Sequence, residues 1–317
     1  MPANPSVVAR GVVPLLAFAA LTAAMDVYGG NRLQHVTPES LAAVSFTFTA
    51  IFFIGIDVLR SGGASFRLLR HNRHDVVAIN VTTAITWLAT FYALRNLEPA
   101  VVNVVGLALA PVFTVLAGPL LRRNSTVIGM EVAVALGICG FLGVLVWGTF
   151  AGQTGIGEIG TGKATWGIVF SVVCAIGSSA NIIYMKRLSD GGHSPQAVLA
   201  IRFLLMIVIG WLMTAVSGRD DIVDAVVPGL VVAIIGIGLP IYVLQIGIRH
   251  TEPITTSLLV SLSPLFAYLM QFLDGRLRPS TLTIVGILGI VTLAAVGTYS
   301  RNSHDRRTAL PSVPSSV

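Results

Sequence analysis

Ten apolar segments, each about 20 residues long, follow one another along the chain. A helix of that length crosses the ~30 Å hydrocarbon core of a bilayer. No alternation of the outer-membrane-barrel kind occurs, and charged residues make up only 11% of the chain against roughly 25% in a typical soluble domain. The sequence therefore predicts an all-α membrane protein with ten transmembrane helices. Their approximate ranges are 11–29, 38–59, 75–95, 99–121, 127–150, 165–186, 195–217, 226–249, 253–273 and 280–299.

One pattern occurs twice, at residues 91–114 and 242–267. Each copy has an aromatic and apolar run, a polar break, a Glu-Pro pair and an apolar helix. The acids, Glu98 and Glu252, stand beside the positive end of a helix, and the proline follows at the first position, where its missing N–H costs nothing. The spacing of about 154 residues is close to half the chain, so we expect two homologous halves.

A second proline lies inside the apolar run of each copy, Pro111 in the first and Pro264 in the second. A proline inside a helix frees the carbonyl four residues earlier and bends the helix. We therefore expect bends at both positions.

Five spans in each half, an odd number, bring the second half into the membrane from the opposite side. Inverted repeats of this kind are typical of secondary transporters. Most Arg and Lys residues fall in loops on one side, so the positive-inside rule places both termini in the cytoplasm of an inner or plasma membrane protein. The expected domains are a first repeat at 1–150, a loop at 151–164, a second repeat at 165–300 and a disordered cytoplasmic tail at 301–317.

Several other classes are disfavoured. The net charge of +6 follows from the positive-inside loops and does not indicate nucleic acid binding. Residues 157–164 approach a phosphate-binding loop, but Ala164 replaces the required hydroxyl. Cys139 and Cys174 fall inside spans, which argues against a disulfide or a metal site, and the histidines lie in loops or near span ends, which argues against an intramembrane enzyme. No cofactor or metal is expected.

The repeated stretch with its two prolines resembles the EamA branch of the drug/metabolite transporter superfamily. The second half also carries the Arg-Phe pair of that family at Arg202, whereas the first half has Ser45 at the matching position. The turn at Asp274 departs from the Gly-Glu of many members. The resemblance implies ten helices in two inverted repeats and export of amino acids, related metabolites or drugs against protons.

Charged residues inside spans are candidate site residues, because a charge at mid-bilayer costs roughly 2.5 to 3.5 kcal/mol. Asp26 could carry a proton or bind a substrate ammonium, or it could reach the outer interface beside Arg32. Arg202 lies about 10 Å into its span and could meet a carboxylate, or its long stem could reach cytoplasmic water. Glu131 is a second candidate for proton coupling, or else an interfacial charge.

Polar residues at helical spacing on several spans complete the predicted site. Small and hydroxyl residues also pack helices together in lipid, so packing is the alternative for each one alone. Packing does not need Asn, Trp, Tyr and Gln to recur on several helices, whereas a hydrated cavity does. The residues predicted to bind substrate besides Asp26 and Arg202 are Asn80, Trp87, Asn103, Asn181, Tyr242, Gln245, Ser257, Ser261 and Tyr268.

The sequence thus favours a secondary transporter that exports a small polar metabolite, an amino acid or a derivative, by alternating access, with proton coupling as an option. An exporter of drugs or of sugar- or lipid-linked substrates is one alternative, and a non-transporting scaffold or receptor is another. The expected partners are the substrate and the lipid bilayer. A homodimer stays open, because small residues line helix contacts within and between protomers alike.

Overall fold

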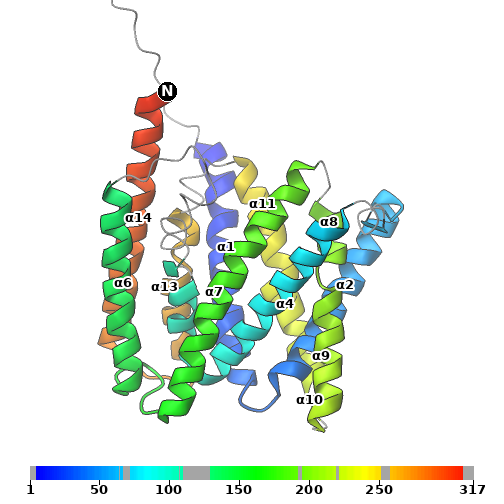
Figure 1. Cartoon of the computed structure of the whole chain (residues 1–317), viewed down its shortest axis with the longest axis horizontal. Coiled ribbons are helices and arrows are strands. Elements are labelled where there is room, and N and C mark those ends of the chain that lie inside the picture. Colours follow the sequence, from blue (N-terminus) through cyan, green and yellow to red (C-terminus); the bar gives the residue numbers. More distant parts are fainter. Residues whose placement is uncertain are drawn as a thin grey trace, which may run out of the picture.

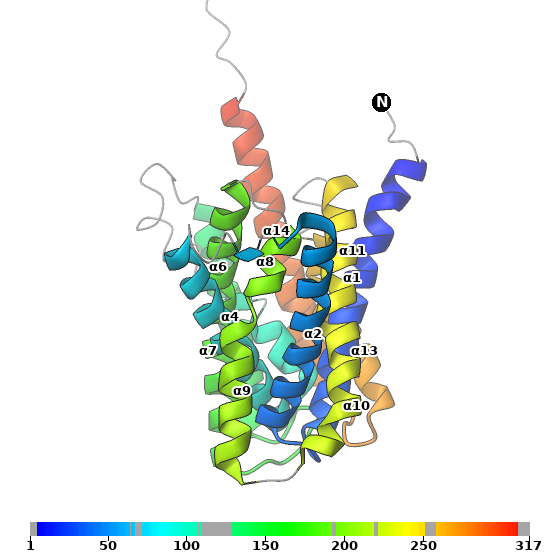
Figure 2. The same ribbon diagram turned by 90° about the vertical axis from the view of Figure 1, so that its right-hand side faces the viewer.

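A computed structural model describes residues 5–63, 65–66, 72–106, 108–109, 129–191, 195–218, 221–250 and 258–309. In these ranges the chain forms a bundle of helices (Figures 1 and 2). Its elements are α1 (Pro5–Arg32), α2 (Pro38–Ser61), α4 (Arg73–Asn96), α6 (Gly129–Phe150), α7 (Thr161–Asp190), α8 (Pro195–Ile201), α9 (Leu204–Ser217), α10 (Ile222–Val232), the π-helical η1 (Ala233–Gly238), α11 (Leu239–His250), α13 (Ser263–Met270), the 3-10 helix η2 (Gln271–Leu273) and α14 (Thr281–Ala309).

Within the described ranges, 8 helices are long and apolar enough to cross a membrane, and each falls on a predicted span. The predicted fourth span is described only in part: a helix begins at Pro99, and most of the remainder lies outside the described residues. The predicted ninth span is described from residue 258 and contains a shorter apolar helix, Leu258–Leu273. Eight of the predicted spans are therefore confirmed as helices of sufficient length and hydrophobicity, and the total of ten stays a prediction.

The first and second halves of the chain interlock. Helix α4 packs along α7, α1 along α11, α6 along α14, and α2 against α9 and α10. Figure 1 shows that α1 and α7, the first helices of the two halves, begin at opposite ends of the bundle. The start of α1 and the end of α14 lie at the same end (Figures 1 and 2).

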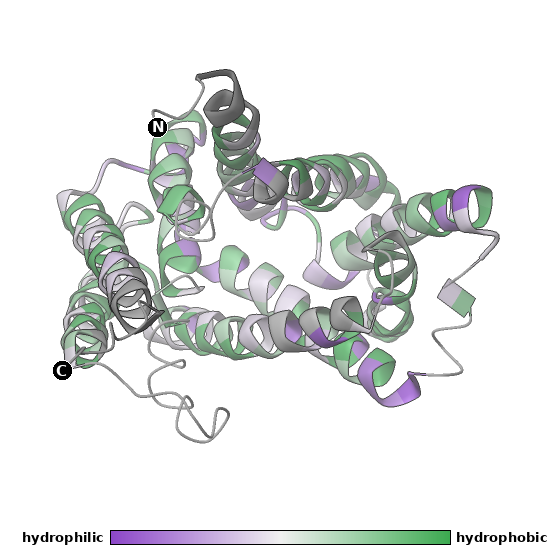
Figure 3. Cartoon of the chain, turned by 90° about the horizontal axis from the view of Figure 1, so that it is seen from above, coloured by the Kyte–Doolittle hydropathy of each residue, from purple (hydrophilic) through white to green (hydrophobic). Residues whose placement is uncertain are grey.

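Glycines let helices of the two halves approach closely, as small residues do in membranes. A Cβ on Gly289 of α14 would lie 2.3 Å from the ring of Phe141 on α6, and a Cβ on Gly148 would lie 2.6 Å from Leu282. Seen along the bundle, apolar residues occur on helices all around it (Figure 3). Large apolar side chains such as Leu212 are exposed on the outside, which suits a surface that faces lipid.

One prediction about the tail was wrong. Residues 301–309, expected to be disordered, continue α14 as far as Ala309. No proline interrupts the sequence of this helix before Pro311. Residues 310–317 lie outside the described part of the chain.

Candidate functional site

A buried carboxylate on α1 lies in a polar cluster that contains side chains from both halves of the chain. Asp26 is 7% exposed. The amide of Asn103, on the helix that begins at Pro99, donates a 2.6 Å hydrogen bond to the Asp26 carboxylate. The same amide lies 3.2 Å from the hydroxyl of Ser263, which opens α13 in the second half. Asp26 and Asn103, two of the predicted substrate-binding residues, therefore meet in one polar cluster.

The cluster sits where a helix is interrupted. Residues 258–260 are helical, a turn follows at 261–262, and α13 then begins at Ser263 with Pro264 in its first turn. The Ser263 hydroxyl lies 3.1 Å from that of Thr22 and donates to the carbonyl of Ala19. The start of a helix carries partial positive charge, so this break favours a carboxylate nearby. Sequence reasoning missed Thr22 and Ser263, because hydroxyls are common in membrane helices.

The geometry around Asp26 differs from that of an interfacial charge paired with Arg32. The Arg32 guanidinium lies over the ring of Tyr28, 5.2 Å from its centroid. Among the residues that the structure describes, no basic side chain forms an ion pair with Asp26. Within the described part of the chain, its charge is met by the Asn103 amide.

The second buried charge, Arg202, lies at another helix interruption. Helix α8 ends at Ile201 and α9 begins at Leu204, so Arg202 falls in the turn between them. Its guanidinium donates to the Asn181 side-chain oxygen over 2.7 Å and contacts the sulfur of Met185. Arg202 is 8% exposed, and its Nε has no hydrogen-bond partner among the described residues. No described carboxylate pairs with this buried cation.

Two predicted amides hold helices together around this break. Asn181 on α7 donates to the hydroxyl of Thr83 on α4 over 2.7 Å. Asn80 on α4 donates to the carbonyl of Ile201 and accepts from the N–H of Leu205, so it satisfies backbone groups that the interruption leaves without helical partners. These bonds connect α4 with α7 and with the break between α8 and α9, and substrate binding by the two amides stays a prediction.

The remaining predicted residues lie elsewhere. Trp87 packs against Phe46 and Phe91 in an aromatic cluster. The Tyr268 hydroxyl donates to the carbonyl of Ser280, and the Ser261 hydroxyl donates to the carbonyl of Leu258. Tyr242 is 63% exposed on the outside of α11. The side chains of Gln245 and Glu131, and all of Pro111 and Ser257, fall outside what the structure describes.

The end of the bundle opposite the termini is tied together by carboxylates. Glu98, which the sequence indicated only as a helix start, is 1% exposed. It accepts hydrogen bonds from the N–H of Gly155 at 2.6 Å, the amide of Gln271 at 2.5 Å and the hydroxyl of Thr283 at 3.1 Å. Burial raises the pKa of Glu98, and these hydrogen bonds act in the opposite direction. One side chain thus joins the first half, the connecting loop and the second half.

A second carboxylate, Asp221, joins two segments at the same end of the bundle. Asp221 accepts hydrogen bonds from the Thr37 N–H at 2.6 Å and the Ser40 hydroxyl at 2.5 Å, at the start of α2. Burial acts to raise the pKa of Asp221, but the hydrogen bonds from Ser40 and Thr37 outweigh it and hold the pKa below its ordinary value.

A third carboxylate, Asp274, connects two segments at the end of α1. Asp274 accepts a 3.0 Å hydrogen bond from the Asn31 side chain and pairs with Arg276. Like the contacts of Glu98 and Asp221, the bond from Asn31 connects the first half of the chain with the second.

The π-helical segment η1 packs against α1 at Met25. A Cβ on Gly236 would lie 2.3 Å from Cγ of Met25, the neighbour of Asp26. Short π-helical segments are rare and often occur at functional sites. In the amino-acid sequence, the only signal for this π-helix is the segment itself, Ala-Ile-Ile-Gly-Ile-Gly.

Comparison with known proteins identifies the family to which the chain belongs. A search of curated proteins gives no match. One solved structure, described as "Crystal structure of protein", has a TM-score of 0.61 and 23% sequence identity, and the match covers 96% of this chain and 100% of the other. That likeness shows the fold. The model of the EamA-like transporter family matches residues 9–146 and 165–298, one match in each half. The chain therefore belongs to the EamA-like transporter family, a family of membrane transporters and not of enzymes.

Proposed function

We propose that the chain is a secondary transporter that exports a small zwitterionic metabolite, an amino acid or a derivative, in exchange for protons. The observation that carries the proposal is a pair of buried, unneutralised charges. Asp26 has no cationic partner and Arg202 has no anionic partner among the described residues. Since an isolated buried charge is costly, each is expected to serve a ligand.

A zwitterion supplies both missing partners. Its ammonium group would bind at Asp26 and its carboxylate at Arg202, whose planar guanidinium is suited to carboxylates. The unpartnered Nε of Arg202 supports this role, because a carboxylate could satisfy it. Protonation of Asp26 in the absence of substrate would couple substrate movement to protons.

The proposal includes alternating access between two inverted repeats. The opposite directions of α1 and α7 and the crosswise packing of the two halves support it. Both buried charges lie at or beside interrupted helices, as binding sites of secondary transporters commonly do. The bonds of Glu98, Asp221 and Asp274 would then close the end opposite the termini, which we assign to the outside, and would open in the other state.

Counterflow tests the proposal. The purified chain is placed in proteoliposomes preloaded with one unlabelled amino acid, and uptake of the same labelled compound is followed across a panel. We expect transient accumulation of at least one compound and its loss in both Asp26→Asn and Arg202→Gln.

The matched control is Asp75→Asn, which removes a carboxylate that pairs with exposed Arg187 near the start of α4. We expect this variant to transport normally. Full activity in Asp26→Asn and Arg202→Gln would remove the site assignment. No accumulation of any amino acid by folded, inserted protein would exclude the substrate class and favour drugs or sugar- or lipid-linked compounds.

A further inference from the structure

A groove that neither buried charge lines lies on the outside of the bundle. It has a volume of about 740 Å³ and runs between α2 on one side and α10, η1 and α11 on the other. Its walls include Phe52, 58% exposed, and Ile234, 52% exposed, while Phe53 at 6% lies buried beneath. Gly238 in the opposite wall has no side chain to fill the space.

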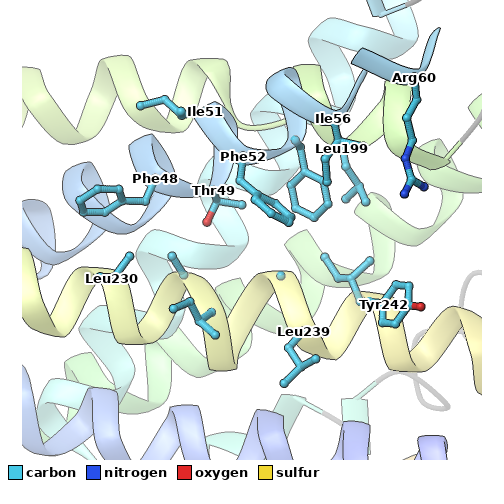
Figure 4. A pocket seen from close by; sticks show the side chains of 15 residues that line it. Phe48, Thr49, Ile51, Phe52, Ile56, Arg60, Leu199, Leu230, Leu239 and Tyr242 are labelled. Carbon is cyan, nitrogen blue, oxygen red and sulfur yellow. The ribbon is translucent and has the colours of Figure 1, made fainter. Parts of the chain in front are cut away.

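The charged residue that lines the groove lies at one end, together with a tyrosine. Figure 4 shows Arg60 and Tyr242 at one end and Phe48 and Leu230 at the other. In the described part of the chain no side chain pairs with or hydrogen-bonds to Arg60, and the Tyr242 side chain is 63% exposed. An apolar channel that ends in a cation and a hydroxyl fits an amphiphile with an anionic head.

The length of the groove matches one leaflet of a bilayer. Phe48 and Arg60 are twelve residues apart on α2, or about 18 Å at 1.5 Å per residue. Half of a ~30 Å hydrocarbon core is about 15 Å. Arg60 stands near the last residue of α2, at the end of the bundle where the termini lie, so the polar end would meet the headgroup layer. Tyrosine is likewise enriched at that depth.

We propose that this groove is a binding site for one anionic phospholipid of the leaflet beside the termini. Its phosphate headgroup binds Arg60 and the Tyr242 hydroxyl, and an acyl chain lies along Phe52 and Ile234. Neither Asp26 nor Arg202 lines this groove, so lipid binding here can be tested independently of the transported substrate.

Native mass spectrometry of the full-length protein in detergent tests the headgroup contact. The protein is titrated with phosphatidylglycerol or with phosphatidylcholine of identical acyl chains. We expect tighter binding of phosphatidylglycerol and an approximately fivefold loss in Arg60→Gln, the effect of one basic residue near an anionic headgroup. Arg278→Gln, which removes an exposed arginine at the opposite end, should bind like the unaltered protein.

A second pair of variants tests the apolar channel. Leu239→Trp fills the groove and should lower the retention of both lipids. Leu212→Trp adds the same bulk at a 62% exposed position on α9, outside the groove, and should leave retention unchanged.

Three results would overturn the proposal. One is equal binding of the two lipids. Another is undiminished phosphatidylglycerol binding in Arg60→Gln. The third is disulfide cross-linking between two Ile234→Cys protomers in a background without Cys139 and Cys174, because the groove would then be an interface between copies of the chain.

Discussion

The amide of Asn103 donates a 2.6 Å hydrogen bond to the carboxylate of Asp26. Because the same amide lies 3.2 Å from the Ser263 hydroxyl, it links a carboxylate of the first half to an interrupted helix of the second. A movement of α13 relative to α1 would therefore change the surroundings of Asp26. This is the kind of coupling that alternating access requires.

Removing the Asn103 amide should weaken both folding and transport. Asn103→Ala leaves the buried Asp26 carboxylate without its donor, which costs about 1–3 kcal/mol. We expect a lower thermal unfolding temperature in detergent and reduced counterflow. In the control Asn96→Ala, the lost amide bonds only the carbonyl of Tyr92 on its own helix, so the effect should be smaller. Equal losses in the two variants would argue against a special role for Asn103.

The planar shape of the Arg202 guanidinium, and not only its charge, should be needed for transport. Arg202→Lys keeps the charge but cannot contact both Asn181 and Met185 with a planar fork. Hydrogen bonds to charged groups contribute about 1.5–3 kcal/mol, so we expect at least a tenfold loss of transport in counterflow. Arg187→Lys, at an exposed ion pair with Asp75, should change transport little. Transport by Arg202→Lys at the original rate would mean that the charge alone suffices.

The connecting loop has no space for a side chain where it meets Glu98. A Cβ on Gly155 would lie 2.6 Å from the carbonyl oxygen of Arg278 and 3.0 Å from Cδ of Glu98. Gly155→Ala should therefore destabilise the protein by about 1–3 kcal/mol, as overpacking does. The control is Gly160→Ala in the same loop, where a Cβ meets nothing within 4 Å. Thermal unfolding of the two variants side by side is the measurement, and identical midpoints would contradict the close contact.

The contact between Asp221 and the start of α2 should make stability depend on pH. Its pKa is held below the ordinary value, so its stabilisation is present above the unfolded-state pKa of about 3.9 and is lost as the pH falls through the folded-state pKa. We expect Asp221→Asn to lower the unfolding temperature at about pH 7 and the difference to shrink towards about pH 3.

The control for this pH dependence is Asp224→Asn, which changes an exposed carboxylate three residues further on. It should show little difference from the unaltered protein at either pH. A deficit of Asp221→Asn that stayed constant from neutral to acid would rule out ionisation of Asp221 as its cause.

The sequence by itself determined the membrane class, eight of the spans and the two-fold division of the chain, which the family matches at 9–146 and 165–298 reproduce. These properties follow from local hydrophobicity and from repetition, and both can be read directly from the amino-acid sequence. The helix start at Pro99 is local in the same way, because a proline fixes its own backbone angle.

Only the tertiary structure decided what each polar residue does. Asn80, Asn103 and Asn181 occupy similar apolar surroundings in the sequence, yet one satisfies a broken helix, one holds Asp26 and one holds Arg202. Their partners lie far away along the chain, and a hydrogen bond requires a particular distance and direction, which hydropathy does not encode. The burial of Glu98 could not be predicted from the sequence for the same reason, because three distant segments meet at its carboxylate.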